Sequence, residues 1–350
     1  MSFDDDAYGA LTDHTDDARW AYGTGFADPL AGVSTAVPGD VDRADLAAYC
    51  LMLGDDALVL SHRLQQWVTR APELEDELAL ANIGLDLLGQ ARLLLGRAGE
   101  VEGAGRDEDA LAYLRDAAEF RNVRLAELAD ADFAHLVARL LVFSCWRLPL
   151  LDRLAGSRDP VLAAIGAKGL KEVTYHREYA AQWVVRLGDG TDLSHQRMQT
   201  AIDAVRPEVG ELFETHDVEA RLASAGIAVD PALLRPEFDE AMSQVLDAAT
   251  VTASTPAAGG STGGGRAGGG SAGGGSAGGG RAGGGSAGGG RAGDGSAGDG
   301  STGGGSAGDG STGGGSTDGG RGRDGVHGPE LGEVLAEMQE LARALPGGVW

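Results

Sequence analysis

The stretch that decides the fold is residues 42–69, which read DRADLAAYCLMLGDDALVLSHRLQQWVT. Apolar side chains recur along it at alternating spacings of four and three residues. That spacing aligns them on one side of an α-helix over several turns. The sequence therefore predicts a long amphipathic helix over 42–69. The expected buried stripe is Leu46, Cys50, Leu53, Ala57, Leu60, Leu64 and Trp67.

The same periodicity continues along the chain to about residue 251. It predicts further helices over 73–97, 108–128, 133–154, 160–187, 193–213 and 231–251. In the helix over 73–97, the expected stripe is Leu74, Leu78, Ala81, Leu85 and Leu88. No stretch alternates with the period of two that is typical of strands. Long helices with short connections predict an all-α bundle of antiparallel neighbours.

Composition divides the chain into four parts. Residues 1–40 carry eight aspartates and one arginine, which predicts an acidic, mostly disordered tail. The helical bundle is expected over 41–251. Residues 252–325 hold more than half of the 59 glycines and no large apolar residue, which predicts a flexible linker. Residues 326–350 are expected to form a C-terminal helix from Pro329 that docks on the bundle or on a partner.

Charge and cysteine content exclude several classes of protein. The formal net charge of −25 argues against partners that are nucleic acids or anionic membranes, since no basic stripe is present. Two cysteines, Cys50 and Cys145, are too few for a disulfide framework or a zinc finger. The acidic start lacks the pattern of a signal peptide, and no uninterrupted apolar run reaches about 18 residues. The sequence predicts a cytoplasmic protein.

A long four-helix bundle can hold a di-iron centre, for which two helices each supply a Glu and two others a Glu-x-x-His pair. The chain contains no Glu-x-x-His. The nearest pairs, Asp132 with His135 and Asp192 with His195, stand at predicted helix starts, where Asp is a favourable cap. The helix over 133–154 has no carboxylate before Asp152. One helix of the bundle would therefore supply no ligand.

Glu172 and His176 are four residues apart on the inward side of the helix over 160–187. One interpretation is a surviving metal half-site or an acid–base pair. The other is a buried pair in which each side chain satisfies the other, with Lys171 or Arg177 close enough to neutralise the glutamate. Asp86, on the helix over 73–97, is followed three residues later by glycine instead of histidine. Because the ligand set is incomplete, we expect no catalytic, cofactor-binding or metal-binding residue.

Other catalytic patterns are missing from the sequence. It has no nucleophile elbow, no phosphate-binding loop and no cysteine beside a histidine. Trp67, Trp146 and Trp183 stand on helical stripes, where they are expected to anchor the core.

Several runs resemble the C subunit of bacterial phenylacetyl-CoA epoxidase (phenylacetate-CoA oxygenase). They are LGDDALVL at 53–60, APELE at 71–75, LALANIGLDLLGQAR at 78–92, AKGLKEVTYH at 167–176 and RLGDGTD at 186–192. LAEMQ at 335–339, LPG at 345–347 and the terminal Trp350 fit as well. The resemblance spans about 41–250 and 326–350. The acidic tail and the long glycine-rich tract depart from it.

The resemblance implies a ferritin-like fold and a place in a multicomponent enzyme. That enzyme uses oxygen and NADPH, through its other subunits, to epoxidise the ring of phenylacetyl-CoA. Its catalytic subunit carries the di-iron site, and a further small subunit and a reductase complete the complex. The C subunit is implied to be a fold relative that supports the catalytic one, with no cofactor and no activity of its own.

Three hypotheses follow from the sequence. The first and favoured one is a non-catalytic structural partner of a di-iron subunit. The second is an oxygenase subunit with a degenerate metal site around Asp86, Glu172 and His176. The third is a helical interaction protein unrelated to oxygenation.

Overall fold

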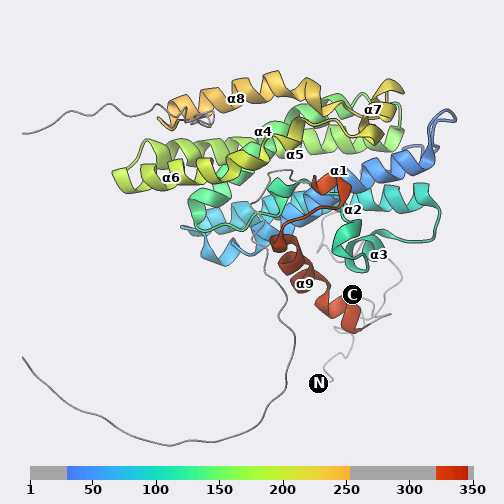
Figure 1. Cartoon of the computed structure of the whole chain (residues 1–350), viewed down its shortest axis with the longest axis horizontal. Helices are drawn as coiled ribbons and strands as arrows, with labels where there is room; N and C mark the ends of the chain where they lie inside the picture. The colour runs from blue at the N-terminus through green and yellow to red at the C-terminus, as the bar shows by residue number, and fades with distance from the viewer. Residues whose placement is uncertain (1–29, 253–320, 346–350) are drawn as a thin grey trace, which may run out of the picture. The chain divides into compact units, whose positions relative to one another are not determined.

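A computed structural model describes residues 30–252 and 321–345 (Figure 1). Within these ranges the regular elements are all helical, as the sequence predicts. The expectations for residues 1–29, most of the glycine-rich tract and the last five residues lie outside the described part. The α-helices are α1 (Arg43–Gln65), α2 (Leu74–Glu102), α3 (Glu108–Tyr113), α4 (Phe133–Leu154), α5 (Pro160–Gly188), α6 (Asp192–Val205), α7 (Asp217–Ser224), α8 (Arg235–Ala248) and α9 (Pro329–Ala344).

Four long helices form the centre of a ferritin-like bundle. The helix α1 packs along α2, α4 packs along α5, and α2 meets α5 between the two pairs. The helices α6 and α8 cover the outer side of α4 and α5, while α9 contacts α1 and α3 at the opposite side (Figure 1). The expected stripe of α1 is buried, from Leu46 to Leu64, with Trp67 half-buried just beyond its end.

Side-chain caps fix where the central helices begin. Asp42, Asp132 and Asp159 each accept hydrogen bonds from backbone N–H groups in the first turns of α1, α4 and α5. The cap of α6 is Thr191, which accepts from the Ser194 N–H, so the expected cap at the next residue was wrong by one position. Each cap satisfies donors that the helix itself leaves unpaired.

The helix α2 differs most from its prediction. It continues beyond the expected stop to Glu102, where Gly103 adopts φ 71° and ends it. Its expected stripe is exposed: Leu74 shows 65% of its surface, Leu78 58%, Leu85 53% and Leu88 38%. A second apolar stripe faces the core instead, formed by Leu80, Ile83, Leu87 and Leu94.

Two predicted helices are shorter than expected. The helix α3 ends at Tyr113, after which Arg115 turns inward to the buried carboxylate of Asp55. Two short 3-10 turns, Ala117–Glu119 and Arg124–Ala126, replace the rest of the predicted helix. The helix α6 ends at Val205 because Pro207 lacks the N–H group that would continue it. Periodicity also missed the short helix α7.

Described residues outside the expected boundaries of the bundle also pack on it. Val33 and Val37 pack against the core, and Arg97 donates from Nη1 to the carbonyl oxygen of Thr35 at 2.7 Å. Arg323 is buried although it lies within the range expected for the linker. The tail and the linker therefore each contribute residues to the folded unit.

Two described helices, α2 and α4, are long and apolar enough to cross a membrane by length and composition alone. Neither helix contains a long uninterrupted apolar run, because polar residues occur within both. The apolar window of α4 is 94% buried inside the bundle, whereas that of α2 is 50% buried. Core helices of soluble proteins pass the same test, so the finding is weak evidence for a membrane protein.

Candidate functional site

Asp86, Glu172 and His176, which were singled out in the sequence, lie together along the contact between α2 and α5, where Gln90 joins them. His176 Nε2 lies 3.1 Å from Asp86 Oδ2, and Gln90 donates from Nε2 to Glu172 Oε2 at 3.1 Å. On each helix the two side chains are four residues apart, so the two contacts lie one turn apart. We call these four residues the α2–α5 seam.

The seam does not pair Glu172 with His176, as one interpretation of the sequence expected. Each of them pairs with α2 instead, so the two contacts tie the helices together. Glu172 also accepts a contact from Lys168 Nζ one turn back on α5. The expected neutralising partners, Lys171 and Arg177, are not the ones that bind it in the structure. His176 is buried, while Asp86 remains partly exposed.

A di-iron centre does not fit the seam. Among the described residues, no three His, Cys, Asp or Glu side chains converge closely enough to hold a metal ion. The seam offers one imidazole, which faces Asp86, and one glutamate, which is already neutralised by Lys168. Between the buried Arg139 and Arg147, the side chains of α4 are apolar apart from Ser144. The opposite side of the bundle therefore brings no carboxylate toward α2 and α5 from that stretch.

The other two acid–histidine pairs serve helix starts. At the start of α4, Asp132 Oδ1 lies 2.7 Å from His135 Nδ1 and also accepts from the His135 backbone N–H. At the start of α6, His195 Nδ1 lies 2.7 Å from the carbonyl oxygen of Gly188. These contacts stabilise the connections around the helix ends.

A larger cluster of buried charges, which sequence reasoning missed, lies where α1 meets the C-terminal segment. Arg323 donates from Nη2 to Asp56 Oδ2 at 2.9 Å, and Arg147 of α4 approaches the same oxygen at 3.5 Å. The Val123 backbone N–H donates to Asp56 Oδ1 at 2.8 Å. Next to it, Asp55 binds Arg115 in a buried ion pair. Two adjacent aspartates inside the apolar run of 53–60 were the available signal, because buried carboxylates require charged partners.

Burial outweighs the neighbouring charges at two groups of this cluster, whereas the carboxylates around Arg323 raise the pKa of its guanidinium. Burial raises the pKa of Asp55 despite the neighbouring Arg115 guanidinium, and it lowers the pKa of Arg147 to about 10. Both shifts reflect the cost of holding a charge away from water. The charges are almost completely enclosed, so the cluster offers no surface for a substrate. Its role is to join helices and loops.

Residues 33–269 match the model of the family described as phenylacetic acid catabolic protein. The chain belongs to this family. It is 48% identical over 206 residues to the C subunit of the 1,2-phenylacetyl-CoA epoxidase of Escherichia coli (strain K12), a match that covers 59% of this chain and 83% of the relative. The resemblance found in the sequence is thereby confirmed.

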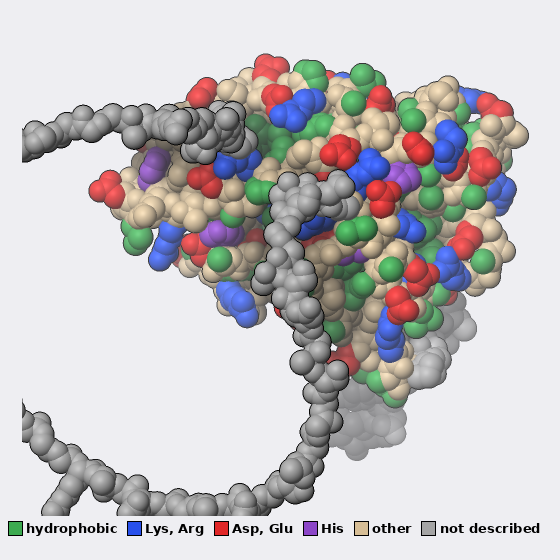
Figure 2. Space-filling model, in the orientation of Figure 1, with side chains coloured by type: hydrophobic (Ala, Val, Ile, Leu, Met, Phe, Trp, Pro, Cys, Tyr) green, Lys and Arg blue, Asp and Glu red, His purple; other side chains and the backbone are tan. Residues whose placement is uncertain are grey.

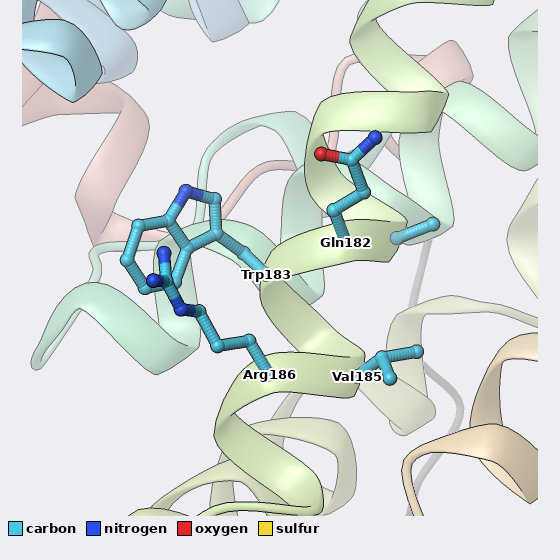
Figure 3. Close-up of a pocket in the computed structure, with 5 residues that line it drawn as sticks. Gln182, Trp183, Val185 and Arg186 are labelled. Carbon is cyan, nitrogen blue, oxygen red and sulfur yellow. The ribbon is translucent and has the colours of Figure 1, made fainter.

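A shallow hollow lies on the surface of this family member. It has a volume of about 560 Å³ and lies along α5, where Gln182, Trp183, Val185 and Arg186 line it (Figure 3). The Arg186 guanidinium lies 4.9 Å from the Trp183 ring centroid, and Trp183 Nε1 donates to Asp76 Oδ1 at 2.9 Å. Trp183 therefore helps to hold α5 against α2, and its side chain offers no group for catalysis. On the face shown in Figure 2, acidic, basic and apolar side chains are interspersed.

Proposed function

We propose that the protein is a structural, non-catalytic subunit of a multicomponent oxygenase that epoxidises the ring of phenylacetyl-CoA. In this proposal it binds and supports the di-iron catalytic subunit, with a small subunit and a reductase as further members of the complex. Oxygen and NADPH act through those other subunits, and the complex works in the cytoplasm. Membership of the phenylacetic acid catabolic protein family supports the pathway.

The observation that carries the non-catalytic role is the pairing within the α2–α5 seam. In a di-iron bundle, facing helices aim carboxylates and imidazoles at a common point between them. Here the equivalent side chains face each other in pairs: His176 with Asp86, and Glu172 with Gln90 and Lys168. A bundle whose polar groups are used to join helices acts through its surface.

Two alternatives have less support. An oxygenase subunit with a degenerate metal site would need further ligands to join Asp86, Glu172 and His176, and the described residues bring none to the seam. If the protein were a helical interaction protein unrelated to oxygenation, its 48% identity to an epoxidase subunit would have no explanation.

Co-expression with the di-iron subunit from the same source tests the proposal. We expect the two chains to elute together in size-exclusion chromatography at low and at high salt. Permanent complexes rest on apolar contacts, and salt screens the repulsion between the acidic surfaces. Dissociation at high salt would indicate an ionic interface. Failure to associate at any salt concentration would reject the structural-partner role and leave the generic helical protein.

A further inference from the structure

The C-terminal segment, residues 321–345, contacts the bundle at residues that are distant in the sequence. Its helix α9 packs against α1 and α3, and Gln339 donates from Nε2 to the carbonyl oxygens of Ala112 at 3.1 Å and Arg115 at 3.0 Å. A helix as short as α9 is marginal in water by itself, so its structure depends on the bundle. Four apolar side chains of α9 are buried in this contact: Leu331, Val334, Leu335 and Met338.

Arg323 occupies a polar site whose acceptors match a guanidinium group. Its Nη1 donates to Asp56 Oδ1 at 3.1 Å and to the carbonyl oxygen of Arg121 at 2.7 Å, while its Nη2 donates to Asp56 Oδ2 at 2.9 Å. The two bonds to Asp56 form a bidentate pair, which a planar guanidinium can make and an ammonium group cannot. The Arg323 side chain is only 5% exposed. The site therefore favours arginine over lysine.

The charge of Arg323 is shared by two further acids of the bundle. The carboxylates of Glu211 and Glu219 both interact with it, and both are repelled by Asp56. Arg147 approaches Asp56 only at 3.5 Å. Without the C-terminal segment, these three acids would repel one another without their common cation. The bundle thus carries an acidic site that the segment neutralises.

Two glutamates of the bundle bind the main chain of the segment. Glu211 Oε1 accepts a hydrogen bond from the Gly322 N–H at 2.6 Å, and Glu127 Oε2 accepts one from the Gly328 N–H at 2.8 Å. Glu127 Oε1 also lies 2.6 Å from His327 Nδ1. Side chains of the bundle therefore bind both main-chain and side-chain groups of the segment, as a protein does when it binds a peptide.

We propose that the part of the bundle that receives residues 321–345 is a peptide-binding site. It holds this segment by these contacts alone, without the covalent connection through the glycine-rich tract. Its ligand class is a peptide with an arginine ahead of an amphipathic helix. Arg323 supplies the selectivity, and α9 supplies the apolar contact. This inference concerns a single chain and is independent of the proposed role in an oxygenase.

A chain with one protease recognition sequence inserted within residues 281–290 tests the proposal, because a cut there leaves every described residue in place. After cutting under native conditions, the C-terminal piece is expected to elute together with the bundle in size-exclusion chromatography. Native mass spectrometry should show both pieces in one complex. Release of the C-terminal piece on cutting would overturn the proposal, whether or not the bundle then stays folded.

Arg323→Lys and Arg321→Lys in the same cuttable chain separate recognition of a guanidinium from general attraction between charges, since both variants keep the positive charge. Arg321 is the matched control because its side chain is 37% exposed and its ion pairs lie at the surface. It should retain the C-terminal piece like the wild type. Arg323→Lys should bind the piece about a hundredfold more weakly, because lysine cannot form the bidentate pair with Asp56. Equal retention by both variants would overturn the selectivity for arginine.

A fluorescent peptide with the sequence of residues 321–345 tests the site without any substitution in the protein. Its anisotropy should rise with the cut wild-type chain as it replaces the bound piece, and unlabelled peptide should reverse the rise. An unlabelled peptide with Arg323→Lys should compete about a hundredfold less well. The uncut chain should bind the labelled peptide at least about tenfold more weakly, since its own tethered segment occupies the site. Equal binding to cut and uncut chains would place the peptide elsewhere and overturn the proposal.

Discussion

Arg323 and Asp56 form a buried ion pair that joins positions 267 residues apart in the sequence. Arg323 also donates from Nη1 to the carbonyl oxygens of Met52 at 2.8 Å and Arg121 at 2.7 Å. The backbone of its neighbour Gly322 lies very close to the backbone of Asn122. A Cβ atom at position 322 would come within 2.1 Å of the Asn122 carbonyl oxygen. These contacts fix the segment that follows the glycine-rich tract, and they bring α9 back to the bundle.

Replacing Arg323 by methionine should lower the free energy of unfolding by about 3–5 kcal/mol, because it leaves the buried Asp56 carboxylate without its main partner. Arg321→Ala is the control, since that side chain is 37% exposed and its ion pairs are on the surface. It should cost less than about 1 kcal/mol. Urea unfolding of both variants measures the difference. Equal, small losses would show that Arg147 alone suffices for Asp56.

Shortening the segment 255–318 to about fifteen residues should leave the melting temperature nearly unchanged. Each halving of a flexible loop changes the free energy of closure by only about 0.6 kcal/mol, in the stabilising direction. The anchor at Arg323 lies outside the deleted range, so α9 should stay docked. Calorimetry and protection of α9 from proteolysis report the outcome. Insoluble protein after this deletion would reveal a structural role of the tract.

His176→Gln should lower the free energy of unfolding by about 1–3 kcal/mol, because a buried side chain loses its bond to Asp86. It should leave the turnover of the assembled complex nearly intact. Both quantities are measured on the same preparation, by denaturant titration and by epoxidation rate per complex. A thousandfold loss of turnover with unchanged stability and assembly would instead assign His176 to the chemistry.

Asp45→Asn should destabilise the chain modestly, and the effect should depend on pH. The hydrogen bond from Arg221 lowers the pKa of Asp45 in the folded state. The ionised form is thus favoured by folding, and its contribution is complete above the unfolded pKa of about 3.9 and is lost as the pH falls through the lower, folded value. Because Arg221 is largely exposed, we expect a difference of about 0.3–1 kcal/mol at pH 7.

Urea unfolding of wild type and Asp45→Asn at pH 7 and near pH 3 checks this expectation. The two curves should separate at pH 7 and converge in acid. A difference that persists unchanged at the lower pH would mean that the ion pair between α1 and α7 is not its source.

The buried side of a helix can be predicted from the sequence where one apolar stripe dominates. The prediction fails where two apolar stripes compete on the same helix. On α1 a single stripe from Leu46 to Leu64 defines the buried side. On α2, Leu78 and Leu85 repeat as regularly as Ile83 and Leu87, so periodicity cannot choose between the two faces. The choice is made by the packing of α2 against both α1 and α5.

Long-range pairing explains the rest of what the sequence did not predict. Arg323 follows a tract without large apolar residues, and nothing local indicates that it enters the core. Arg115 ends α3 early because it reaches Asp55, 60 positions away. The caps at Asp42, Asp132 and Asp159 were predictable in kind because they depend only on neighbours in the sequence. Three residues of the seam, Asp86, Glu172 and His176, were predictable from the sequence. Gln90 and the pairing were not, because both depend on how α2 and α5 align.

Iron content tests the central claim most directly. The isolated chain and its co-purified complex with the catalytic subunit are loaded with ferrous iron, separated from unbound metal and analysed for iron per chain. The account predicts that the isolated chain holds only substoichiometric iron, whereas the complex holds about two irons, all lost when the catalytic subunit is removed. Two irons per isolated chain would contradict a non-catalytic role for this subunit.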